Sequence, residues 1–284
     1  MDPTPLHPLI DVDELAGLVA REDPVVVLDV RWALGSGVQR EAFAAGHVPG
    51  SRLVDLDADL SGAPGEGGRH PLPATPDFLA AMRRLGVRRD ARVVVLDAAD
   101  GTSAARAWWL LRHHGHGAVQ VLDGGFAAWA AGGAPIETGA GDPVAPGDLD
   151  GEPGSMPVVD ADAAAVLARE GTLVDARAAV RYRGESEPVD PVAGHVPGAV
   201  DVPTTDHVGP EGRWDDAATL ARRFEDAGVD PARPVGAYCG SGVTACHTVL
   251  ALEVAGRSAA LYPGSWSAWV RDPSRPVATG PEPG

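Results

Sequence analysis

Residues 238–246 are Tyr238-Cys239-Gly240-Ser241-Gly242-Val243-Thr244-Ala245-Cys246. The apolar run 234–238 is typical of a buried strand, and the run 247–255 is typical of a helix. The sequence therefore predicts that Cys239 lies in a strand-to-helix turn, where the glycines let the backbone curl closely around its sulfur.

A turn of this kind favours a reactive cysteine. The first N–H groups of a helix have no partner within the helix, and they lie at the positive end of its dipole. Such a setting stabilises a thiolate, which is the nucleophilic form of cysteine. The alternative is a small buried structural cysteine. Glycine, serine and threonine neighbours favour the nucleophile.

The chain contains two copies of one pattern, because four landmarks recur in the same order. We therefore predict two domains of one kind, at 1–138 and 157–275. A Gly-, Pro- and Asp-rich linker is expected at 139–156, and a frayed tail at 276–284. The paired landmarks are 25–31 with 172–177, 46–50 with 194–198, 93–97 with 235–239, and 122–129 with 262–269.

Helical patterns alternate with apolar, β-branched runs inside each copy. In the first copy, helices are expected at 13–20, 77–85 and 103–113, and strands at 25–31, 93–97 and 118–122. This alternation predicts an α/β fold, a mostly parallel sheet flanked by helices. Ligands of such sheets bind beyond the carboxyl ends of the strands, which is where Cys239 is expected.

Composition excludes several classes of function. The net charge of −17 disfavours nucleic acids and anionic membranes as partners. The sequence has no lysine, so Schiff-base and P-loop chemistry are excluded. The start Met1-Asp2-Pro3-Thr4-Pro5 does not resemble a signal peptide, and no apolar run approaches the ~20 residues of a membrane span. With only Cys239 and Cys246, a reducing, cytoplasmic setting is expected.

The loop at 239–245 resembles the active-site loop of the rhodanese superfamily, in its mercaptopyruvate sulfurtransferase form. The repeat extends this resemblance over nearly the whole chain and implies two tandem rhodanese-like domains. In that family the cysteine takes sulfur from a small-molecule donor, 3-mercaptopyruvate or thiosulfate, and forms a persulfide. The sulfur then passes to a thiol acceptor such as thioredoxin, or to cyanide, and no metal or organic cofactor is implied.

The two copies differ at the nucleophile. Asp97 stands where the second copy has Cys239, and residues 98–102 lack the Gly-Ser-Gly turn. Only the second copy is therefore expected to be catalytic. A cysteine phosphatase needs an arginine six residues after its cysteine, and Ala245 stands there instead. A non-catalytic binding module on the same scaffold remains an alternative, against which the intact loop argues.

The donor is not decided by these residues. Thiosulfate-preferring relatives carry arginine and lysine after the cysteine, whereas this chain has Gly240 and Ser241. Arg181 matches a family arginine that binds the carboxylate of a 2-oxo acid. A second arginine is common just before the Gly-His-Val-Pro-Gly segment, but 187–192 contains none. Weaker carboxylate binding is therefore expected, and thiosulfate stays open as the donor.

The resemblance also implies roles for further residues. Ser241, His70 and Asp57 match a proposed Ser-His-Asp proton relay, although Asp55 and Asp59 are equally available to the sequence argument. His47 and His195 recur in both copies, so a structural role is expected for them. The backbone N–H groups expected to bind the substrate and the persulfide belong to the loop residues Gly240, Ser241, Gly242, Val243 and Thr244.

Overall fold

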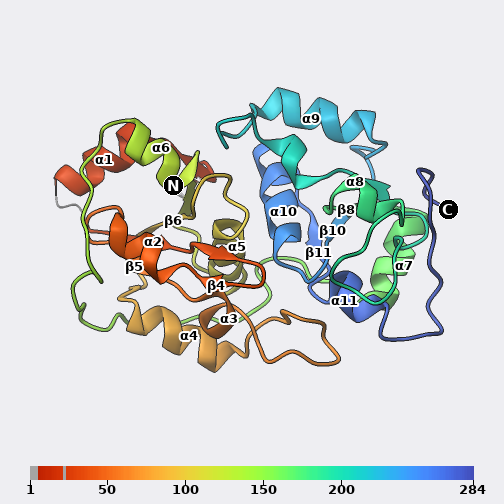
Figure 1. Ribbon diagram of the computed structural model, residues 1–284, viewed down its shortest axis with the longest axis horizontal. Coiled ribbons are helices and arrows are strands. Elements are labelled where there is room, and N and C mark those ends of the chain that lie inside the picture. Colours follow the sequence, from red (N-terminus) through yellow and green to blue (C-terminus); the bar gives the residue numbers. More distant parts are fainter. Residues whose placement is uncertain (1–5, 22–23) are drawn as a thin grey trace. The chain divides into compact units, whose positions relative to one another are not determined.

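The computed structural model describes residues 6–21 and 24–284, which divide into two units (Figure 1). The first unit holds the described residues of Met1–Ser61 together with Pro73–Met156 and Pro210–Trp214. The second holds Gly62–Leu72, Pro157–Gly209 and Asp215–Gly284. The start 1–5, which carries the expectation about a signal peptide, lies outside the described residues.

The first unit is built on a five-stranded parallel sheet in the order β1-β7-β6-β2-β5. A two-stranded hairpin, β3-β4, lies outside it. The strands are β1 (Leu9–Ile10), β2 (Val25–Asp29), β3 (Trp32–Ala33), β4 (Gly37–Val38), β5 (Arg52–Leu53), β6 (Arg92–Leu96) and β7 (Val119–Leu122). The helices are α1 (Val12–Ala20), α2 (Arg40–Ala45), α3 (Leu56–Asp59), α4 (Thr75–Arg84), α5 (Ala104–His113) and α6 (Gly125–Ala131).

The core of this unit follows from valine-rich strands covered by amphipathic helices. The carboxylate of Asp11 accepts a hydrogen bond from the Glu14 N–H at 2.7 Å and so fixes the start of α1. Leu15 of α1 and Trp129 of α6 are fully buried against Val94 of β6. Both helices therefore cover one face of the sheet, and α5 packs on β6 and β7.

The second unit repeats this plan with a four-stranded parallel sheet in the order β11-β10-β8-β9. Its strands are β8 (Thr172–Asp175), β9 (Val200–Asp201), β10 (Val235–Tyr238) and β11 (Ala260–Leu261). Its helices are α7 (Ala161–Glu170), α8 (Ala179–Tyr182), the 3-10 helix η1 (Thr204–His207), α9 (Ala217–Asp226), α10 (Thr244–Val254) and α11 (Ser265–Trp269). The predicted α/β fold with two parallel-sheet domains is confirmed.

Helices cover both faces of the second sheet (Figure 1). On one face α7 and α11 pack together over β8 and β10, and Trp266 and Trp269 are buried in the core that they form. On the other face α10 contacts β10 and β11 and is buried along almost its whole length. The predicted helix after Cys239 is therefore a central helix of this unit.

The recurring Asp-x-Arg and histidine landmarks are structural in both units. Arg31 binds Asp29 and the Gly46 carbonyl, and Arg177 binds Asp175 and the Gly194 carbonyl in the same way. The rings of His47 and His195 stack on Phe43 and Tyr182 and contact the carbonyl oxygens of those residues. These contacts tie the Gly-His-Val-Pro-Gly turn to the sheet in each unit.

The expected linker and tail are both bound to their units. In 139–156, the N–H groups of Gly147 and Leu149 donate to the carbonyls of Arg83 and Val87, and Leu149 is buried. Near the C-terminus, Ala278 pairs with His195 through two backbone hydrogen bonds. Backbone hydrogen bonds thus order both stretches, including the tail that was expected to be frayed. A Gly- and Pro-rich composition does not reveal such bonds. Among the described residues, no helix is long and apolar enough to cross a membrane.

A buried histidine pair makes the stability of the second unit depend on pH. His207 and His247 are both fully buried, with their Nδ1 atoms 3.2 Å apart. Burial, His247 and Arg223 hold the pKa of His207 well below 6.5. The unfolded chain therefore binds a proton below pH 6.5 that folded His207 does not bind, so stability is present above this pH and lost below it.

We expect this loss to reach at most about 1.4 kcal/mol per pH unit. The variant His207→Gln should have a shallower dependence of unfolding free energy between pH 7.5 and 5.5 (about two units) than the parent. Parallel chemical denaturation at several pH values measures both slopes. Because buried His113, His114 and His116 contribute equally to parent and variant, the difference reports on the His207 and His247 pair. Equal slopes would contradict the prediction.

Candidate active site

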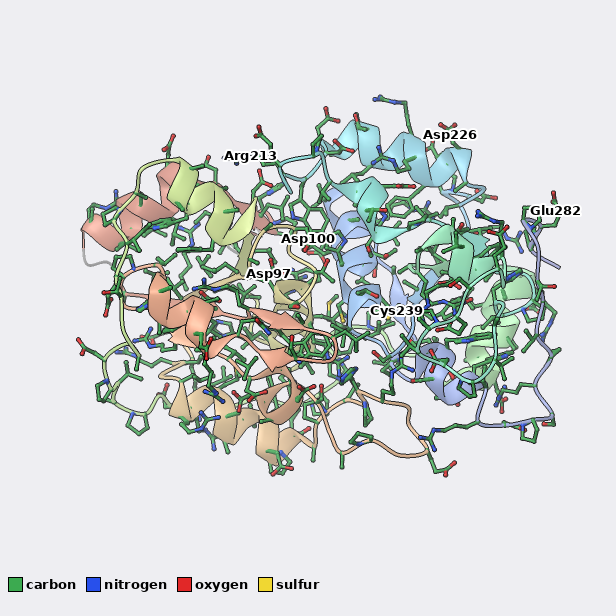
Figure 2. The ribbon with its side chains drawn as sticks, viewed as in Figure 1. Asp97, Asp100, Arg213, Asp226, Cys239 and Glu282 are labelled. Carbon is green, nitrogen blue, oxygen red and sulfur yellow. The ribbon has the colours of Figure 1, made fainter. Side chains whose placement is uncertain are left out.

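Cys239 lies directly after β10, in the turn that leads to α10 (Figure 2). It is only 1% exposed, and the Gly242 N–H donates a hydrogen bond to its Sγ at 3.1 Å. Gly242 has a φ of +81°, and a Cβ there would lie 2.2 Å from the Pro263 carbonyl oxygen, so this position requires glycine. The turn can therefore deliver an N–H group to the sulfur, as a thiolate nucleophile needs.

A second segment, around the start of α11, fixes the backbone of this turn. The N–H groups of Trp266 and Ser267 donate to the carbonyls of Cys239 and Gly240, both at 2.9 Å. The Ser265 hydroxyl oxygen accepts from the Cys239 N–H at 3.1 Å and lies 3.9 Å from its Sγ. These bonds fix the carbonyls of Cys239 and Gly240 toward α11, while the Gly242 N–H donates to the sulfur.

Ser265 itself was not predicted as a site residue. Its φ of +52° is the only positive value on a non-glycine among the described residues. Its counterpart in the first unit is Gly125, with a φ of +55°. A serine at a repeat position that is glycine in the other copy was the signal in the sequence.

Asp97, the counterpart of Cys239, fills the turn of the first unit with its own carboxylate. Burial and the nearby Asp100 raise the pKa of Asp97 to about 6, while the backbone N–H donors oppose this rise. Both carboxylate oxygens accept backbone hydrogen bonds, Oδ1 from Ala99 at 3.1 Å and Gly101 at 3.0 Å, and Oδ2 from Ser103 at 2.8 Å and Ala104 at 3.2 Å.

This arrangement corrects one expectation. Residues 98–102 lack the Gly-Ser-Gly sequence, but the turn after Asp97 still forms a cradle of N–H groups. What separates the two turns is the group that enters them, a fixed carboxylate in one and a cysteine sulfur in the other. The strand-to-helix turn of this fold thus receives an anionic side chain in the first unit, which supports the same use of the turn around Cys239.

Two of the three predicted relay residues lie together. His70 Nδ1 is 2.8 Å from the Ser241 hydroxyl oxygen, and both residues belong to the second unit because Gly62–Leu72 packs with it. Ser241 follows Cys239 by two residues, so this pair lies at the edge of the nucleophile turn. The contact joins residues 171 positions apart in the sequence.

Asp57 belongs to the first unit, where its Oδ2 accepts a hydrogen bond from Trp32 Nε1 at 2.8 Å. The two alternatives have structural tasks, since Asp55 caps α3 and Asp59 pairs with Arg84. All three aspartates therefore have local contacts, and the part of Asp57 in a relay stays a prediction.

Two guanidinium groups lie beside Gly240. A Cβ added to Gly240 would be 2.9 Å from Arg69 Nη2, and 3.5 and 3.6 Å from the Nη1 and Nη2 of Arg181. Arg181 was predicted, whereas Arg69 was missed. The segment 187–192 does lack an arginine, but Arg69 brings a second guanidinium group from a distant part of the sequence. Its position directly before His70 was the available signal.

Two carboxylates hold these arginines. Glu187 accepts from Arg181 Nε at 3.1 Å and from its Nη2 at 2.6 Å. Asp190 bridges both cations, with Oδ2 3.3 Å from Arg181 Nη2 and Oδ1 bound by Arg69 Nη1. Burial acts to raise the pKa of Glu187, but hydrogen bonds from Arg181 and the backbone hold it below its usual value. For Asp190 burial prevails over both arginines, and its pKa is raised.

Cys246 has a different environment from Cys239. It lies on α10, is fully buried, and its Sγ donates to the Gly242 carbonyl at 3.4 Å. Both cysteines are in the reduced, thiol form. The contact of Cys246 with a carbonyl rather than an N–H group does not favour a thiolate.

Comparison with known proteins identifies relatives along nearly the whole chain. Residues 11–132 and 160–272 match the family described as Rhodanese-like domain. A Mycobacterium tuberculosis protein provisionally named thiosulfate sulfurtransferase SseB is 44% identical over 280 residues, 96% of this chain and 97% of that protein. A Pseudomonas aeruginosa protein provisionally named 3-mercaptopyruvate sulfurtransferase is 44% identical over 282 residues, 96% and 98% of the two chains. The crystal structure of SseA from Escherichia coli has a TM-score of 0.80 at 32% identity, over 92% of this chain and 100% of that one.

Proposed function

Since this chain belongs to the rhodanese family and is a sulfurtransferase for 3-mercaptopyruvate or thiosulfate, we propose that 3-mercaptopyruvate is its preferred donor and that Cys239 carries the sulfur. The observation that carries the proposal is a cysteine turn in which the Gly242 N–H donates to Sγ, together with two guanidinium groups at Gly240. A guanidinium group offers parallel N–H donors that match a carboxylate.

In the first half of the reaction, the Cys239 thiolate attacks the donor sulfur. An S–S bond forms, the C–S bond of 3-mercaptopyruvate breaks, and its electron pair stays on the carbon, which takes a proton to give pyruvate. The product on the enzyme is the Cys239 persulfide. The N–H groups of the turn from Gly240 to Thr244 stabilise the anion, with the Gly242 N–H already directed at the sulfur.

In the second half, a nucleophilic acceptor attacks the outer sulfur of the persulfide. The S–S bond breaks and its electron pair returns to Cys239 as the thiolate, while the acceptor leaves with the sulfur. A thiolate acceptor becomes a persulfide, and cyanide becomes thiocyanate. We propose a thiol, such as that of thioredoxin, as the acceptor, and cyanide as the practical assay acceptor.

The Ser241 and His70 pair is proposed to handle the proton. The Ser241 hydroxyl can hand a proton to the departing carbon and be resupplied by the imidazole 2.8 Å away. This pathway needs no change in the charge of Arg181 or Arg69. The arginines bind the donor while the serine and histidine serve the bond that breaks.

Thiosulfate is the second candidate donor. The guanidinium groups at Gly240 also suit a sulfonate, which would leave as sulfite when the S–S bond of thiosulfate breaks. A relative at 44% identity bears the name of a thiosulfate enzyme. Donor preference is therefore the part of the proposal that needs direct measurement.

The test of persulfide formation is the intact mass of the protein after incubation with each donor. We expect a gain of one sulfur atom that is lost on adding cyanide, and no gain in the variant Cys239→Ser. A chain that gains no sulfur from either donor would refute the proposed chemistry. A larger or faster gain from thiosulfate would make thiosulfate the preferred donor and 3-mercaptopyruvate the second candidate.

A further inference from the structure

Asp190 occupies the place between the two guanidinium groups of the site. Its oxygens are divided between them, Oδ1 to Arg69 and Oδ2 to Arg181. Its side chain is only 3% exposed, in the segment between α8 and β9. The same two guanidinium groups lie nearest to Gly240, the residue after Cys239.

A carboxylate bridging two arginines beside the nucleophile is the arrangement that a 2-oxo acid donor needs. The donor carboxylate has the same two oxygens and would seek the same N–H groups. The two carboxylates cannot both bridge these arginines, because like charges in one place repel. A donor bound there must therefore displace Asp190.

Glu187 differs from Asp190 in how firmly it is held. It accepts two hydrogen bonds from Arg181, one from Arg177 at 3.3 Å, and the N–H groups of Val189 and Asp190 at 3.1 Å. Glu187 thus anchors Arg181. Asp190, in contrast, is a carboxylate whose anionic form is destabilised by burial. Of the two, Asp190 is the one that a donor can replace.

We propose that Asp190 is an internal stand-in for the donor carboxylate and sets the apparent affinity of the site for anionic donors. The inference rests on the proposed function, because it assumes that Arg69 and Arg181 bind the donor. Its effect is to weaken donor binding by the free energy needed to release Asp190 from two arginines. This makes Asp190 a residue that sets donor affinity rather than a catalytic one.

The alternative is that Asp190 only orients the arginines, and the two readings predict opposite results. The variant Asp190→Asn keeps the shape of the side chain and removes its charge. If the donor must displace Asp190, the KM for 3-mercaptopyruvate should fall about ten-fold in this variant. The reason is that the arginines lose their charge-assisted hydrogen bonds to residue 190 but keep those to the donor. Orientation alone predicts a KM that rises. The value of kcat should change little, because Asp190 does not contact Cys239 in the proposed reaction.

Glu187→Gln is the matched control. It removes the other carboxylate of the cluster and the anchor of Arg181, so the KM should rise. Binding of pyruvate, measured by titration calorimetry in the Cys239→Ser background, should tighten with Asp190→Asn and weaken with Glu187→Gln. Thermal unfolding of each variant, including a second variant Asp190→Ala, separates these changes in KM and pyruvate binding from misfolding.

An Asp190→Asn protein that is folded but binds pyruvate no more tightly than its parent would overturn the inference. The intact-mass test on the parent keeps the proposed function separate. A parent that forms the persulfide while Asp190→Asn shows an unchanged or raised KM refutes only the role of Asp190. A parent that forms no persulfide refutes the function itself.

Discussion

Replacing Cys239 with serine is expected to reduce the rate of sulfur transfer by at least about a thousand-fold, because a hydroxyl in the same place cannot form a persulfide. The turn should survive the change, since the Gly242 N–H can donate to the serine oxygen instead of the sulfur. The measurement is thiocyanate formation from 3-mercaptopyruvate and cyanide. Thermal unfolding should show a variant as stable as its parent within about 1 kcal/mol.

Cys246→Ser is the matched control for this loss. Cys246 is buried on α10 and contacts the Gly242 carbonyl, a contact that a serine hydroxyl can also make. Most of the activity should therefore remain, with some loss of stability because a hydroxyl replaces a thiol in an apolar environment. Comparable inactivation of both variants would show that the roles of the two cysteines have been assigned wrongly.

Local sequence decided the parts of the structure that depend on neighbouring residues. The strand β10, the turn at Cys239 and the helix α10 follow from an apolar run, two glycines and a long apolar helix. The repeat was equally visible, because Asp29 with Arg31 and Asp175 with Arg177 recur at one spacing and build one buried contact in each unit. Patterns of this kind need no knowledge of the tertiary fold.

The surroundings of the nucleophile were less predictable because they come from distant segments. Arg69 reaches Gly240 from 171 positions earlier in the chain, so the absence of arginine from 187–192 does not mean that the site has a single guanidinium group. That segment contributes the opposite charge instead, through Glu187 and Asp190. The positive φ of Ser265 was hidden as well, although the turn has nearly the same φ at the matching Gly125 of the first unit.

The cradle in the first unit shows a second limit of sequence reasoning. The sequence predicts that the Gly-Ser-Gly motif supplies the N–H cradle, yet Asp97 receives four backbone hydrogen bonds from a turn without this motif. A strand that leads directly into a helix supplies such donors by its geometry. The residue types mainly decide what can enter the turn.

Arg181 offers the sharpest test of the donor. In the variant Arg181→Ala, kcat/KM for 3-mercaptopyruvate should fall about 10- to 100-fold, because a charge-assisted hydrogen bond contributes ~1.5–3 kcal/mol. The loss for thiosulfate should be smaller. Side-by-side assays of both donors with cyanide, for parent and variant, give the two ratios.

Arg183→Ala is the control, because Arg183 is a near neighbour in sequence whose guanidinium group pairs with the exposed Glu185. It should leave both donors unaffected.

The presence of Arg69 changes what the parent enzyme should show. With a second guanidinium group beside Gly240, the absence of arginine from 187–192 no longer predicts a weak carboxylate site. Any high KM for 3-mercaptopyruvate should instead come from competition with Asp190, which holds both arginines in the free enzyme. The parent should still prefer 3-mercaptopyruvate over thiosulfate in kcat/KM, because Gly240 and Ser241 replace the cations that favour thiosulfate. If thiosulfate is the better donor and Arg181→Ala affects both donors equally, the arginines serve as a general anion site. The chain would then be a sulfurtransferase without the proposed preference.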